Sequence, residues 1–158
     1  MHHSQIDATI LFLEVTDKVN LVKFSAFRDL FEASIRLQIG AFNHSNEDPV
    51  FGDLLKIEYA ATHNAIVAAQ RLLVSPPSTP TEGAFLETAS EALLLLQKGA
   101  PDHSTMTDAF CAAMRACAST PPNSDAHSAM LRALQILDKL IELQVAQLEL
   151  NINAEIIG

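Results

Sequence analysis

The chain has 158 residues, a formal net charge of −9, and 49% apolar but only 18% charged residues. The length predicts a single domain whose core needs no disulfide or metal to hold it. The charge argues against phosphate backbones and anionic lipid surfaces as partners and permits basic proteins. Only five glycines, with abundant alanine and leucine, favour helix over strand, so we expect an all-α fold.

The first predicted element, over residues 4–23, is the least regular. Its apolar residues recur on two neighbouring faces of a helix. Its β-branched residues also permit a hairpin in which residues 11–15 pair with residues 19–23. Residues 16–18 contain no glycine or asparagine for a tight turn between such strands. We therefore expect a helix, with the hairpin as the alternative.

Two further helices are predicted in the first half of the chain. One begins near Ser25 and ends at Gly40, and the polar, acidic residues 43–49 follow it as a loop. The other covers residues 50–74, where two adjacent apolar rows recur at helical spacing. Residues 75–81 then contain three prolines, which cannot continue a helix. This Pro-rich segment is too short to separate domains, so we expect an inter-helix loop.

The next helix is predicted over residues 82–98, with Thr81 as its N-terminal cap and Phe85 on its core face. Gly99, followed by Pro101, is a typical helix stop. We therefore expect a sharp turn directly after residue 98.

The helix after that turn begins at a predicted capping box, formed by Thr105 and Asp108. Its spacing directs Phe110, Met114 and Cys117 toward the core.

Cys111 and Cys117 are the only cysteines, and both lie on this predicted helix. Six residues of helix separate them by about 9 Å along the axis, whereas a disulfide needs Cα atoms within about 7 Å. We expect two unbridged thiols that act as small buried hydrophobes. Free thiols and the lack of a leader-like segment at the N-terminus predict a cytoplasmic protein, and no stretch is long enough to cross a membrane.

The last predicted helix covers residues 124–156 and is apolar over most of its circumference. A helix of about thirty residues is ~45 Å long, which exceeds the dimensions of a compact domain with a radius of gyration near ~15 Å. We therefore expect it to project and to form a homodimer seam with a second copy; the alternative is that it is the central helix of its own bundle. Met130 begins this apolar seam, and the predicted interface residues are Leu134, Leu137, Ile141, Val145, Leu148 and Ile152.

His63 is the histidine that most needs an explanation, because it sits in the middle of a predicted helix. Histidine phosphotransfer domains present a histidine on such a helix, with a lysine three residues later and a glycine beside that lysine. Ile66 and Val67 occupy those positions here. His63 also recurs with Lys56 and Gln70 every seven residues, so we expect a solvent-facing polar stripe.

Motifs for catalysis, metals and cofactors are absent from the sequence. It contains no HExxH pair, Gly-rich phosphate loop or G-x-S-x-G elbow. The cysteine spacing fits no zinc framework, and we expect no metal and no cofactor. An enzyme would require convergence of scattered residues, such as His44, Asp48, His63 and His103.

These observations predict one domain over residues 1–158, an all-α bundle of five or six helices with a long C-terminal helix. The low charge content leaves little polar cover for the surface, which favours a partner or a second copy over the exposed apolar faces. We expect a non-enzymatic interaction protein of adaptor, chaperone, immunity or regulatory type, with no nucleic-acid or membrane partner. The alternative is a sensor or carrier of a small apolar ligand in the bundle core.

Overall fold

The computed structural model of the protein describes residues 2–99 and 101–157, with side chains described for residues 8–99 and 101–155. Within these residues it contains no strand and five α-helices: α1 (His2–Asn43), α2 (Phe51–Leu72), α3 (Pro80–Lys98), α4 (His103–Ala118) and α5 (Asp125–Ile157). The predicted all-α bundle with a long C-terminal helix is confirmed.

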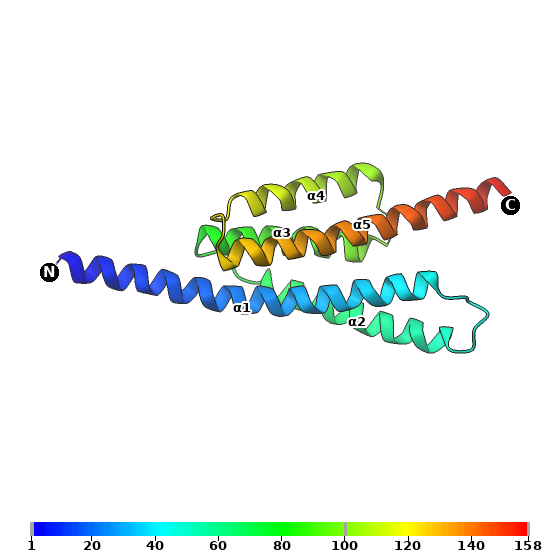
Figure 1. Cartoon of the computed structure of the whole chain (residues 1–158), viewed down its shortest axis with the longest axis horizontal. Helices are drawn as coiled ribbons and strands as arrows, with labels where there is room; N and C mark the ends of the chain where they lie inside the picture. The colour runs from blue at the N-terminus through cyan, green and yellow to red at the C-terminus, as the bar shows by residue number, and fades with distance from the viewer. Residues whose placement is uncertain (1, 100, 158) are drawn as a thin grey trace.

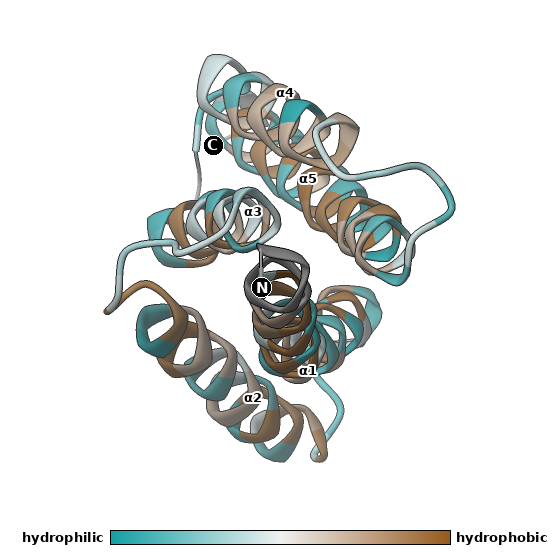
Figure 2. Cartoon of the chain, turned by 90° about the vertical axis from the view of Figure 1, so that its left-hand side faces the viewer, coloured by the Kyte–Doolittle hydropathy of each residue, from teal (hydrophilic) through white to brown (hydrophobic). Residues whose placement is uncertain are grey.

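Consecutive helices run in alternating directions, so that α1, α3 and α5 point one way and α2 and α4 the other (Figure 1). Helix α1 packs against α2, α3 and α5, while α4 packs against α3 and α5. In the end view, α1 lies between α2 on one side and the α3–α5 layer on the other (Figure 2). The long helices α1 and α5 overrun their shorter neighbours at opposite ends of the molecule (Figure 1).

Helix α1 is continuous where two separate elements were predicted. It runs without a break from His2 to Asn43, so the boundary expected near Ser25 is wrong and the hairpin alternative is excluded for residues 4–23. No glycine or proline occurs between residues 4 and 39, so nothing in the local sequence stops the helix.

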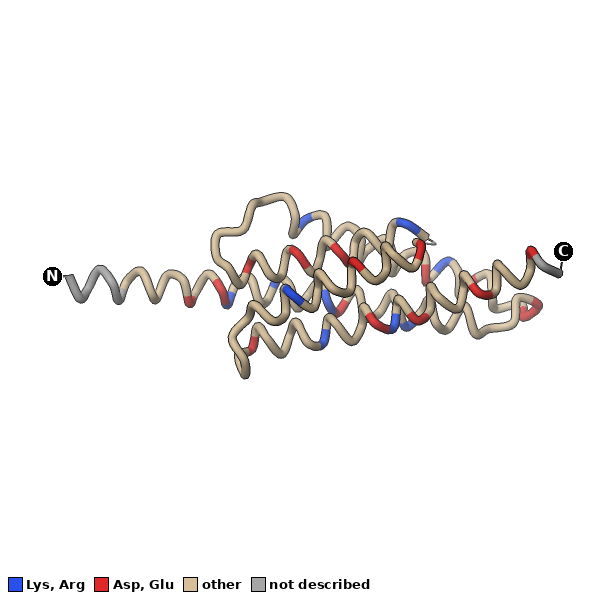
Figure 3. Tube along the Cα trace, turned by 90° about the horizontal axis from the view of Figure 1, so that it is seen from above, with Lys and Arg blue, Asp and Glu red and all other residues tan. Residues whose placement is uncertain are grey.

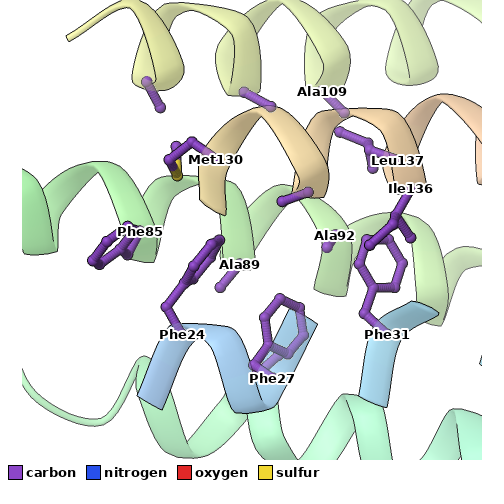
Figure 4. Close-up of a cluster of buried hydrophobic side chains, with 14 of the residues drawn as sticks. Phe24, Phe27, Phe31, Phe85, Ala89, Ala92, Ala109, Met130, Ile136 and Leu137 are labelled. Carbon is purple, nitrogen blue, oxygen red and sulfur yellow. The ribbon is translucent and has the colours of Figure 1, made fainter. Parts of the chain in front are cut away.

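The core is built from phenylalanines of α1 and α3 and small residues of the helices around them (Figure 4). Phe24 of α1 and Phe85 of α3 stack with ring centroids 4.5 Å apart, and both are buried. Buried alanines such as Ala89 of α3 and Ala109 of α4 let neighbouring helix backbones approach one another closely.

The helix starts differ from the predicted caps by a few residues. Thr79, not Thr81, caps α3 by accepting a hydrogen bond from the Glu82 amide at 3.1 Å, because Pro80 takes the first helical position. Asp102 caps α4 by accepting from the Thr105 amide at 2.8 Å, so the predicted Thr105 box is wrong. The stop at Gly99 is confirmed by its positive φ of 69°.

Candidate functional site

The first eight described side chains of α1, residues 8–15, are all exposed; we call this segment the N-terminal extension. It lies N-terminal to Asp17, whose carboxylate accepts a 2.8 Å hydrogen bond from Oγ1 of Thr79, the cap residue of α3. Ile10, Leu11, Phe12 and Leu13 are consecutive and between 44% and 68% exposed. Because successive helical residues are about 100° apart, these four make the extension apolar around most of its circumference.

One apolar face continues from the extension along the outside of α1. Phe12, Val15, Val19 and Val22, which we call the outer stripe, follow the alternating spacing of three and four residues that coiled-coil seams use. All four are exposed. Lys18 and Lys23 are also exposed and flank the outer stripe on its two sides by helical spacing. In the sequence, the run of four adjacent apolar residues from Ile10 to Leu13 was the signal that could have identified this surface.

The structure divides the predicted C-terminal seam into a covered and an uncovered part. Leu137 is fully buried in its own chain, as is Met130, so the expectation that Leu137 contributes interface area is corrected. Ile152 is 53% exposed. The residues between these extremes are partly buried against the core: Leu134, Ile141, Val145 and Leu148. The physical reason is the shortness of α4, which begins at His103 and leaves the part of α5 after Val145 without that neighbour.

A surface groove lies where α4 begins. Met106 and Phe110 of α4 and Ile141 and Val145 of α5 line it, and we call it the α5 groove. Its cavity volume is about 180 Å³. By seam spacing, its apolar lining continues along α5 through Leu148 and Ile152.

One side of the α5 groove is acidic. Asp138 lines the groove, and Glu142 and Glu149 fall on the same side of α5 at spacings of 4 and 11 residues. All three are exposed, and we call them the acidic row. Lys139 is turned about 100° from Asp138, and no lysine or arginine follows it in the described part of α5 (Figure 3).

The residues considered for a catalytic cluster, His44, Asp48, His63 and His103, do not come together in one site. His44 and Asp48 meet at 3.0 Å in the exposed α1–α2 loop, where the Val50 amide and then His44 lower the pKa of Asp48. His63 is exposed on α2, and His103 lies at the rim of the α5 groove. Among the described residues, no three histidine, cysteine or carboxylate side chains are placed to share a metal ion.

A polar cluster that sequence reasoning missed closes the end of α4. His127 Nδ1 lies 2.9 Å from Thr120 Oγ1, 3.2 Å from the Cys117 carbonyl oxygen and 3.9 Å from Cys117 Sγ. Burial raises the pKa of the Cys117 thiol. A buried, protonated thiol is a poor nucleophile, so this arrangement suits a hydrogen-bonded helix end better than covalent chemistry.

The two cysteines are free, as predicted. Cys117 is buried, whereas Cys111 is partly exposed and lies at the α5 groove. Met114, predicted to point inward with Cys117, is 46% exposed, so that prediction is wrong. Phe110 is only partly buried.

No protein-family profile, curated protein or solved structure matches this chain significantly. Within the described residues, none of the helices combines the length and hydropathy needed to cross a bilayer. Two features of the described surface stand out, the exposed apolar end of α1 and the groove on α5.

Proposed function

We propose that the protein is a non-enzymatic interaction protein, of adaptor, chaperone, immunity or regulatory type, that binds through exposed apolar helix surfaces. The observation that carries this proposal is the N-terminal extension, in which Ile10 to Leu13 are consecutive, apolar and exposed. An apolar helix surface of this kind marks an interaction site when it lies outside its own core.

The free energy available from these side chains is comparable to the cost of association. The extension and the outer stripe together contain seven large apolar side chains that are between 44% and 70% exposed: Ile10, Leu11, Phe12, Leu13, Val15, Val19 and Val22. Full burial of such a side chain contributes about 1.5–3 kcal/mol, so covering the exposed halves contributes on the order of 5–10 kcal/mol. Association itself costs roughly 4–15 kcal/mol, so these side chains support at most a weak complex by themselves and a stable one needs further contacts.

The cavities around the bundle do not favour the alternative of a ligand carrier. The pockets described on the protein hold about 100 to 220 Å³. Sites that enclose a small-molecule ligand usually measure at least about 300 Å³. The interaction proposal includes no catalytic step, no cofactor and no metal.

Site-specific photocrosslinking tests the proposal in the cells that make the protein. A photoreactive side chain replaces Phe12 in one variant and Tyr59 in the control, since Tyr59 is an aromatic residue on α2 with similar exposure, 74% against 68%. We expect a protein adduct at position 12 and little at position 59. Equal adduct formation at the two positions would refute the proposal.

A further inference from the structure

Two uncovered apolar surfaces lie toward opposite ends of the long axis. The N-terminal extension and outer stripe project at the N-terminal end of α1 (Figure 1). The α5 groove and its continuation through Ile152 lie toward the C-terminal end of α5. Within one chain they lie at opposite ends of the molecule, so neither can cover the other.

The charges beside the two surfaces are of opposite sign. Lys18 and Lys23 are the charged residues nearest the outer stripe by helical spacing. Glu14, one turn before Lys18, lies about 40° farther from the stripe, and Asp17 lies on the opposite side of α1. The acidic row of Asp138, Glu142 and Glu149 borders the α5 groove. Pairing either surface with its own copy brings like charges together, whereas pairing the stripe with the groove brings opposite charges together.

The dimensions of the groove also suit this pairing. An apolar cavity of roughly 150 Å³ accommodates a benzene ring, and the α5 groove holds about 180 Å³. Phe12 is the largest and among the most exposed side chains of the extension. Because α4 begins only at His103, the path along α5 beyond that point is open to another helix.

We propose that the N-terminal extension of one copy docks in the α5 groove of a second copy, with Phe12 in the groove and Lys18 beside the acidic row. This inference rests on the proposed interaction function and names its partner. The contact is heterologous, because it joins different surfaces of two identical chains. A contact of this kind leaves one free extension and one free groove at the two ends, so assembly continues as the concentration rises.

Two full-length variants disable one surface each. Phe12→Asp places a charge on the extension, and Ile152→Asp places one beside the groove; both positions are more than half exposed, so both variants fold. The matched controls are Tyr59→Asp on α2 and Leu150→Asp, which lies on a different side of α5 from Ile152. Sedimentation velocity over a concentration series measures the mass.

The wild type and both controls are expected to exceed the protomer mass of 17.1 kDa increasingly with concentration. Each disabling variant weakens self-association by about tenfold or more. An equimolar mixture of the two forms a 1:1 complex and nothing larger, because only one intact extension and one intact groove remain.

Three results would overturn the inference. The first is a wild type that stays at 17.1 kDa at all concentrations. The second is Ile152→Asp associating like the wild type while Phe12→Asp does not, which indicates a symmetric contact between two α1 helices. The third is a mixture that forms no complex. A position-12 crosslink to a different protein, in a chain that remains monomeric, overturns self-docking and leaves the interaction function standing.

Discussion

The same substitution at two positions of the α5 seam is expected to have very different effects on stability. Leu137→Asp removes a side chain that is 0% exposed, and lost burial costs about 1.5–3 kcal/mol. It also places a carboxylate without a partner in the core, which costs several kcal/mol more. The sum is comparable to the total stability of a typical domain, roughly 5–15 kcal/mol. Ile152→Asp, at a position that is 53% exposed, forfeits only about 1 kcal/mol.

Urea unfolding followed by circular dichroism measures both effects. Low protein concentration keeps self-association from contributing to the apparent stability. We expect Leu137→Asp to be unfolded or nearly so without urea, and Ile152→Asp to shift the midpoint by less than about 1 M. Leu137→Met is the volume-conserving control and should cost less than about 1.5 kcal/mol. A folded Leu137→Asp variant with a wild-type midpoint would refute the enclosure of Leu137 by its own chain.

Two further predictions concern local interactions. Thr79→Val should lower the free energy of unfolding by about 1–2 kcal/mol, because it removes the α3 cap and the hydrogen bond to Asp17. The control, Thr81→Val, should have little effect. Equal urea midpoints for the two variants would contradict the observed cap. Burial, and then Glu87, raises the pKa of Glu91. A carboxyl whose pKa is raised by folding destabilises the folded state above that pKa and not below its unfolded value. Glu91→Gln should therefore be more stable than wild type at pH 7, and the difference should vanish as the pH falls below about 4; a difference independent of pH would count against this cause.

The turns of this fold were predictable because proline and glycine set them locally. The Pro-rich segment over residues 75–81 and the stop at Gly99 act through their own backbone restrictions, whatever the surroundings. The exact caps were less predictable, because neighbouring Thr79 and Thr81 are chemically equivalent and Pro80 decides between them.

The covered part of the seam could not be predicted from helical spacing. Leu137 and Ile152 belong to the same apolar seam, yet one is buried and the other exposed. The difference arises because α4 is shorter than α5. The apolar pattern of α5 carries no information about the length of α4. The apolar run from Ile10 to Leu13 was visible in the sequence, but its position outside the bundle followed only from where α3 meets α1.

The two cysteines differ in accessibility, so a thiol reagent can label one of them selectively. Cys117 is enclosed and its thiol pKa is raised by burial, so it reacts slowly with alkylating reagents. Cys111 is partly exposed at the α5 groove. A maleimide dye therefore attaches preferentially to Cys111 in the unmodified sequence, and its emission reports directly on whatever enters the groove.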